Sequence, residues 1–177
     1  MIWAFSDESE RAATMLFGVP LIEPGAVVAS RAALAQLLLP GQRRVHTAKE
    51  SACRRRELLD VVASLETEAI VLTLRREIGV SRRSARARLL TEASLIIAER
   101  EVVRWVLDHQ EPAQAHRDRQ AIDVAMRQVR HDVVYDHQPS HSEPLIWAID
   151  ATLWAVGSGG DWRRRAGSNV EIRQLRP

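Results

Sequence analysis

Short apolar runs alternate along this chain of 177 residues with longer segments in which apolar residues recur every three to four positions. The short runs are typical of β-strands and fall at 2–5, 12–19, 26–29, 42–46, 69–74, 102–107, 133–135 and 170–175. The periodic segments are typical of helices and fall at 30–39, 47–65, 81–100, 117–129 and 145–156. Because strands come first and then alternate with helices, we expect an α/β fold with a mixed sheet and helices on its faces, in a single domain over residues 1–177.

Capping residues mark the expected starts of three of these helices. Ser30 and Ser81 each precede a periodic segment and are suited to accept a hydrogen bond from its first amides. Residues 47–50 (TAKE) match a capping box, in which the side chains of Thr47 and Glu50 bond to each other's backbone amides. Glu50 is therefore expected to have a structural role, against which any functional role has to be weighed.

The segment 145–156 (LIWAIDATLWAV) is apolar on every side except at one carboxylate, Asp150. A proline at position 144 and a glycine at position 157 bound it, as is usual for a helix. A helix that is apolar all round is a buried helix. Burying a lone charge costs on the order of several kcal/mol unless the charge is paired, protonated or bound to a metal. Asp150 therefore requires a partner.

Two other acids are placed where they could bind a metal ion together with Asp150. Asp7 follows the first expected strand and Asp108 ends a later one, so both are expected at one edge of the sheet beside the buried helix. Carboxylate oxygens are the ligands that Mg²⁺ and Mn²⁺ prefer. The alternative is that Asp7 forms a turn, Asp108 caps the next segment, and Asp150 accepts hydrogen bonds from an arginine.

This order of elements and acids resembles a large, poorly characterised group of bacterial proteins with a ribonuclease-H-like fold. Those proteins open with a strand that runs into Asp-Glu-Ser-Gly, carry a histidine on the strand before the first long helix, and close with a helix marked Gln-x-Ala-Asp. The matching segments here are WAFSDES (3–9), RVHTAKE (44–50) and PLIWAID (144–150). The resemblance spans nearly the whole chain and implies a ribonuclease-H-like mixed sheet with helices on both faces.

By this resemblance, Asp7, Asp108 and Asp150 match the catalytic and metal-binding acids best, and Glu8 is a further candidate. The sequence departs from the pattern at three positions. Glu10 stands where glycine is usual after Asp-Glu-Ser, and Trp147 and Ile149 replace the glutamine and alanine before the last acid.

The resemblance also implies an acid on the first long helix and a role for the preceding histidine. Glu50 and Glu57 compete for the acid, with Glu50 as a helix cap and Glu57 as a surface residue in the alternative interpretations. His46 would position an attacking water or a phosphate; otherwise it is a half-buried strand residue.

The basic residues are 24 arginines and one lysine, and the net charge is only +2. Arginine presents a planar fork suited to phosphate, but a GC-rich genome also favours it. Two clusters are candidate nucleic-acid contacts, and they comprise Arg82, Arg83 and Arg86 at a helix start, and Trp162, Arg163 and Arg164 near the end of the chain. Arginines in a first helical turn oppose the macrodipole, which makes a phosphate backbone a reasonable partner. The alternatives are solvated arginines and a tryptophan packed on the core.

Composition narrows the remaining possibilities. The one cysteine, Cys53, cannot form an intrachain disulfide, and the N-terminal segment lacks the pattern of a signal peptide, so we expect a cytoplasmic protein. No segment approaches about 20 uninterrupted apolar residues, so we expect no membrane span. A glycine-rich phosphate loop, a Rossmann fingerprint and a GxSxG elbow are all absent from the sequence.

The sequence thus predicts a nuclease that hydrolyses phosphodiester bonds of RNA or DNA with Mg²⁺ or Mn²⁺ held by Asp7, Asp108 and Asp150. The first alternative is a non-catalytic module of the same fold that binds nucleic acid or protein, for which Trp147 is the main support. The second alternative is a structural ion pair between Asp150 and a buried arginine.

Overall fold

A computed structural model describes residues 1–176 of the chain. Its strands are β1 (Ile2–Arg11), β2 (Thr14–Ile22), β3 (Thr67–Arg75), β4 (Val102–Asp108), β5 (Val134–Gln138) and β6 (Val170–Leu175). Its α-helices are α1 (Pro24–Ala35), α2 (Ala52–Ser64), α3 (Arg82–Glu99), α4 (Pro112–Val129), α5 (Pro144–Ser158) and α6 (Gly160–Arg165). Short 3₁₀ turns occupy Thr47–Lys49 and Ser140–Ser142. Over the described residues, none of the helices combines the length and apolarity that crossing a membrane requires.

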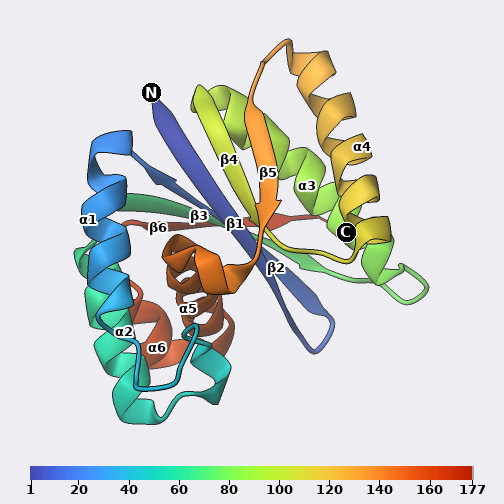
Figure 1. Cartoon of the computed structure of the whole chain (residues 1–177). Coiled ribbons are helices and arrows are strands. Elements are labelled where there is room, and N and C mark those ends of the chain that lie inside the picture. Colours follow the sequence, from blue (N-terminus) through green and yellow to red (C-terminus); the bar gives the residue numbers. More distant parts are fainter. Residues whose placement is uncertain (177) are drawn as a thin grey trace.

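The six strands form one mixed sheet in the order β5-β4-β1-β2-β3-β6 (Figure 1). The hairpin β1–β2 and the pair β2–β3 are antiparallel. The outer pairs are parallel, because β4 pairs with β1, β5 with β4, and β6 with β3. The expected α/β class with a mixed sheet is therefore confirmed.

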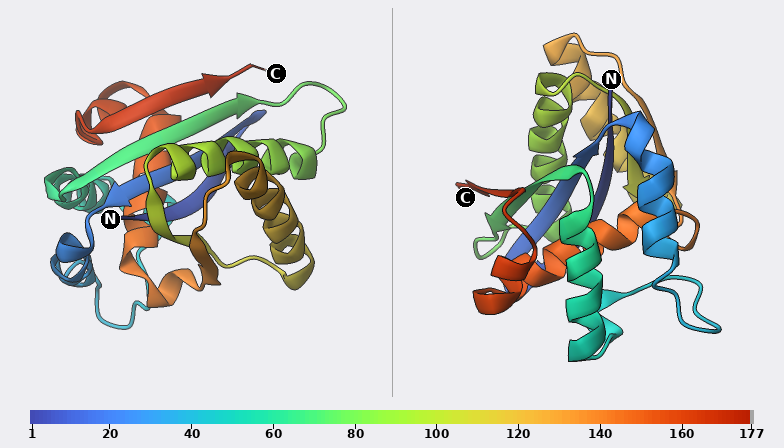
Figure 2. Two further views of the ribbon diagram at one scale, coloured as in Figure 1. Left: turned by 90° about the horizontal axis from the view of Figure 1, so that it is seen from above. Right: turned by 90° about the vertical axis from the view of Figure 1, so that its left-hand side faces the viewer.

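Helices cover both faces of the sheet. Figure 2 shows α3 and α4 on one side and α1 and α2 on the other. The first face buries apolar side chains of the strands against α3 and α4, and the second buries them against α1, α2 and α5. The expected placement of helices on both faces is confirmed.

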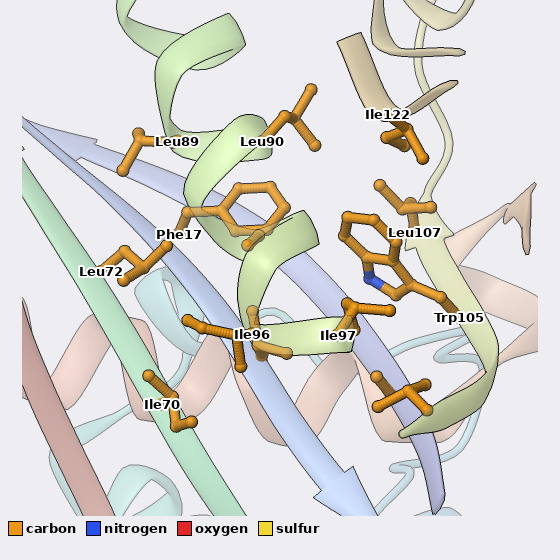
Figure 3. Close-up of a cluster of buried hydrophobic side chains, with 14 of the residues drawn as sticks. Phe17, Ile70, Leu72, Leu89, Leu90, Ile96, Ile97, Trp105, Leu107 and Ile122 are labelled. Carbon is orange, nitrogen blue, oxygen red and sulfur yellow. The ribbon is translucent and has the colours of Figure 1, made fainter. Parts of the chain in front are cut away.

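The core under α3 is built mostly from aliphatic residues around two aromatic rings, Phe17 and Trp105 (Figure 3). Trp105 is fully buried on β4, and its indole N–H donates a hydrogen bond of 2.8 Å to the hydroxyl of Ser6 on β1. Because a buried polar group needs a partner, this bond satisfies both side chains and ties the two central strands together.

Three expected elements are wrong. Residues 26–29 are not a strand, and Ser30 does not begin a helix, since both lie inside α1. Pro24 occupies the first turn of α1, where its missing amide proton costs nothing. Residues 42–46 form turns and bends, not a strand.

The expected capping box is also wrong. Helix α2 begins after Ser51, whose hydroxyl accepts a hydrogen bond from the amide of Arg54. Glu50 lies outside the helix; its carboxylate accepts a hydrogen bond of 3.1 Å from the side-chain amide of Gln42.

Candidate functional site

Asp7 and Asp108 lie on the same face of the sheet because of the pairing of β1 with β4. Ser6 and Leu107 are partners in this parallel pair and point toward α3. The next residue on each strand points to the opposite face, because side chains alternate along a strand. Asp7 was expected just after the first strand, or in a turn in the alternative interpretation. Both are wrong, since β1 continues to residue 11 in its pairing with β2.

Helix α5 brings Asp150 to this face. The partner of Asp7 on β2 is Gly18, and a Cβ built on Gly18 would lie 2.2 Å from Cδ1 of Ile149. Glycine is therefore required for α5 to approach the sheet this closely. The helix is capped by the buried carboxylate of Glu143, which also pairs with Arg31 of α1. These contacts fix α5, and with it Asp150, against the strand that carries Asp7.

The three carboxylates share an electrostatic field. The pKa of Asp7 is raised well above its usual value, first by burial and then by the negative charges of Asp108 and Asp150. Burial also raises the pKa of Asp108, against the opposing influence of the backbone amide of His109 and the charge of Arg44. Like charges held close together disfavour ionisation, so a proton or a cation would stabilise this cluster.

Asp150 has partners within the protein. Its Oδ2 accepts a hydrogen bond of 2.8 Å from the backbone amide of Thr47 and lies 3.5 Å from Nδ1 of His46. Burial alone would raise the pKa of Asp150, but these contacts outweigh it, and the pKa is lowered. No arginine nitrogen within residues 1–176 lies within 4.0 Å of Asp150, so the expected alternative of a buried arginine pair is wrong.

The donors fit a divalent cation in chemistry and charge. Three carboxylates offer hard oxygen atoms, and the raised pKa of Asp7 reflects repulsion that a cation would relieve. Within the part of the chain that the structure describes, however, no three His, Cys, Asp or Glu side chains are gathered closely enough to hold a metal ion.

Glu8 points away from the three carboxylates, since alternation places it on the α3 face. There its carboxylate forms an ion pair with Arg86, and it lies 3.2 Å from a guanidinium nitrogen of Arg82. Arg86 is only 4% exposed and donates two hydrogen bonds, of 2.9 and 2.7 Å, to Asp118 of α4. The expected role of Arg86 in nucleic-acid binding is therefore wrong, because its guanidinium is buried between two carboxylates.

Asp118 is a buried polar residue that the sequence analysis missed. It is 0% exposed and also accepts a hydrogen bond of 2.7 Å from Gln114, while Nε2 of His137 lies 3.3 Å away. These contacts outweigh the opposing influence of burial and lower the pKa of Asp118. Its spacing from Ile122 and Ala125 on one face of α4 was the signal that could have revealed it.

The other expected site residues are dispersed. Glu50 lies near the guanidinium of Arg54, with 3.9 Å between Oε2 and Nε, and Glu57 pairs with the same arginine at 2.6 Å. Arg82 and Arg83 are exposed at the start of α3. Arg163 and Arg164 are exposed on α6, where Arg164 pairs with Asp161.

Trp162 and Trp147 both have partners within the protein. The ring of Trp162 meets that of Trp154 edge-on, with 5.0 Å between ring centres. Trp147, the residue in place of glutamine, is 3% exposed, and its indole N–H donates to the carbonyl of Ser140. Trp147 thus anchors the Ser140–Ser142 turn beside Asp108.

The sheet order, the helices on both faces and a structural match define a protein with the ribonuclease-H-like fold. A solved structure with this fold is ribonuclease HII of Archaeoglobus fulgidus, in its complex with PCNA. It matches 89% of this chain and 73% of its own, with a TM-score of 0.53 and 16% sequence identity. At that identity the match concerns the fold. No protein-family model and no curated protein matches the sequence.

Proposed function

We propose that this protein is a metal-dependent nuclease that hydrolyses phosphodiester bonds at the face of the sheet formed by β1, β4 and α5. Asp7, Asp108 and Asp150 hold Mg²⁺ or Mn²⁺, and RNA or DNA is the substrate. The proposal rests chiefly on the pairing of β1 with β4, which puts Asp7 and Asp108 on the face against which α5 packs. The raised pKa of Asp7, caused first by burial and then by the charges of Asp108 and Asp150, is consistent with it. The ribonuclease-H-like fold is consistent with it.

Each acid has a distinct part in this scheme. Asp7 has the weakest intrinsic tendency to ionise, so it gains most from a cation. Asp150 is held ionised by His46 and Thr47 and supplies a fixed negative charge. Bound Mg²⁺ or Mn²⁺ supplies a water of lowered pKa and neutralises charge on the phosphate. His46 is placed beside Asp150, where it can orient water or a phosphate oxygen.

A nuclease assay with Mn²⁺ on RNA, DNA and hybrid substrates tests the proposal. We expect cleavage by the wild type, and a loss of at least about a hundredfold in Asp7→Asn and Asp150→Asn, since electrostatic groups at such sites contribute factors of this order. Asp132→Asn, a change at an exposed acid on the loop before β5, is the matched control. Absence of cleavage by the wild type, or equal cleavage by Asp150→Asn, contradicts the proposal.

A second candidate is a non-catalytic module of the same fold that binds nucleic acid or protein. The contacts of Asp150 with Thr47 and His46 favour it, because they satisfy one of the three acids without a metal. Calorimetry with Mn²⁺ separates the two candidates. Metal binding that is lost in Asp7→Asn and in Asp150→Asn favours the nuclease, whereas no heat of binding in the wild type favours the module. In either case a cytoplasmic location and a single domain over residues 1–177 stay predictions.

A further inference from the structure

Arg11 is a cation without an acidic partner beside the carboxylate face. It is the last residue of β1 and lies on the same side of the strand as Asp7, four residues away. Among residues 1–176, no Asp or Glu oxygen lies within 4.0 Å of its guanidinium, and no hydrogen bond uses its N–H groups. Many of the other arginines, such as Arg86 and Arg76, are paired with carboxylates.

The side chain of Arg11 is nevertheless held in place. Its guanidinium carbon lies 5.5 Å from the centre of the Trp154 ring on α5. A Cβ built on Gly157 would lie 2.8 Å from Cδ of Arg11. The Arg11 side chain therefore crosses α5 at a glycine, where the helix has no side chain of its own to block it. A cation over an indole face is attracted by the ring quadrupole. Arg11 is thus ordered in advance by contacts that leave its donors free.

Arg55 of α2 approaches the same ring. Its guanidinium carbon is 4.5 Å from the centre of Trp154, and its Nε and Nη2 donate to the carbonyls of Thr47 and Ala48. Its Nη1 makes no hydrogen bond among the described residues. Two guanidinium groups therefore contact one indole, and among the described residues neither has a carboxylate oxygen within 4.0 Å.

This cluster lies next to Asp150. Trp154 is one helical turn after Asp150, about 6 Å along the axis of α5, and the turn held by Arg55 also donates the amide that binds Asp150. On its other side, Trp154 contacts Trp162, over which Arg56 lies at 5.6 Å. Arginines and indoles therefore follow one another from the acids toward α6, a pattern that suits the alternating phosphates and bases of a polynucleotide.

We propose that Arg11, Arg55 and Trp154 form a phosphodiester-binding subsite that holds a polynucleotide strand a few nucleotides from the three carboxylates. This proposal deepens the proposed nuclease function and rests on it for the identity of the reaction. Phosphate contacts carry no sequence information, so RNA and DNA of equal length are expected to bind through this subsite alike.

Fluorescence anisotropy with a labelled single-stranded oligonucleotide of about twelve nucleotides tests the subsite in EDTA, where no cleavage occurs. We expect Arg11→Gln to weaken binding about tenfold and to reduce the slope of log K against log salt by about 0.7, the value for one phosphate contact on a single strand. Arg11→Lys restores the slope, because it keeps the charge. Arg173→Gln is the control, since that arginine lies on the outer strand β6 and pairs with Glu171.

Three results would overturn the subsite. The first is equal affinity and slope in Arg11→Gln and wild type, and the second is an equal loss in Arg173→Gln. The third is competition by polyglutamate of matched charge that is as effective as competition by unlabelled oligonucleotide. That result would show that the protein attracts any polyanion. The nuclease assay is independent of these results. If Arg11→Gln weakens binding but the wild type does not cleave, the subsite is supported and the nuclease function is contradicted. If the wild type cleaves but Arg11→Gln binds as the wild type does, the nuclease function is supported and the subsite is contradicted.

Discussion

Asp7 and Asp150 interact across the contact between β1 and α5, yet their pKa values are shifted in opposite directions. Burial, and then the negative charges of Asp108 and Asp150, favour the protonated form of Asp7. Asp150 is stabilised as an anion by an amide and an imidazole. The two acids of the candidate site are therefore expected to respond differently to pH, to mutation and to metal.

Asp7→Asn is expected to stabilise the metal-free protein at neutral pH, because it removes a carboxylate that its surroundings disfavour. Each unit by which the pKa is raised corresponds to about 1.4 kcal/mol of this gain. In the wild type, the folded state retains a proton that the unfolded chain releases above a pKa of about 4. The contribution of Asp7 is thus fully present below that pH and is lost as the pH rises through the raised pKa.

Urea denaturation between about pH 4 and about pH 8 measures this profile. The exposed Asp132→Asn provides the comparison and should follow the wild type. If the free energy of unfolding of Asp7→Asn parallels that of the wild type at every pH, the other acids do not influence the ionisation of Asp7. Addition of Mn²⁺ should stabilise the wild type and leave Asp7→Asn nearly unchanged.

His46→Ala is expected to raise the pKa of Asp150, because it removes one of the two groups that stabilise the anion. The contribution of a lowered carboxyl pKa is present above the unfolded value of about 4 and is lost as the pH falls. The variant should therefore lose less stability on acidification than the wild type. Carbon NMR titration of the Asp150 carboxyl measures the pKa directly, with His131→Ala, whose imidazole bonds to the carbonyl of Val102, as the control.

Gly18→Ala is expected to destabilise the fold by about 1–3 kcal/mol, the usual cost of inserting a methyl group into a packed contact. The new Cβ would collide with Ile149 and push α5 away from β1. Gly25→Ala is the matched control, because nothing lies within 4 Å of its Cβ position in α1. Thermal unfolding and Mn²⁺ calorimetry of both variants test whether this close approach also sets the position of Asp150. Equal effects of the two substitutions would argue against it.

Arg86→Leu is expected to cost about 3–5 kcal/mol, because it leaves the buried carboxylates of Asp118 and Glu8 without their cation. Arg82→Ala on the same helix should cost less than about 1 kcal/mol, since Arg82 is exposed and its ion pairs are screened by solvent. Guanidinium denaturation compares the two. If they lose similar stability, the buried network is not what joins α3, α4 and β1.

The hydrophobic pattern was sufficient to predict the order of most strands and helices. It failed at residues 24–46 for two reasons. Pro24 suggests a break in the sequence but begins helix α1, and the turns that follow carry apolar residues such as Val45 that are buried in the core. Such segments are decided by tertiary packing, which local periodicity does not contain.

The candidate site was predictable only in part. Asp7, Asp108 and Asp150 were expected together at one edge of the sheet, although the expectation that Asp7 follows the first strand was wrong, since it lies within β1. Arg86 was misassigned because a charged residue suggests the surface, although its spacing from Leu89, Leu90 and Ala93 lies along the buried stripe of α3. The subsite at Trp154 could not have been foreseen, since it joins residues from β1, α2 and α5.

The acids of the candidate site come from β1, β4 and α5, so the first and the last are separated by most of the chain. Synthesis proceeds from the N-terminus, and domains fold as units once their elements have emerged. A nascent chain that has not yet released α5 therefore carries Asp7 and Asp108 without Asp150. The full set of three acids therefore forms only after α5 has emerged and packed on the sheet, so the docking of this helix is a precondition of the proposed activity.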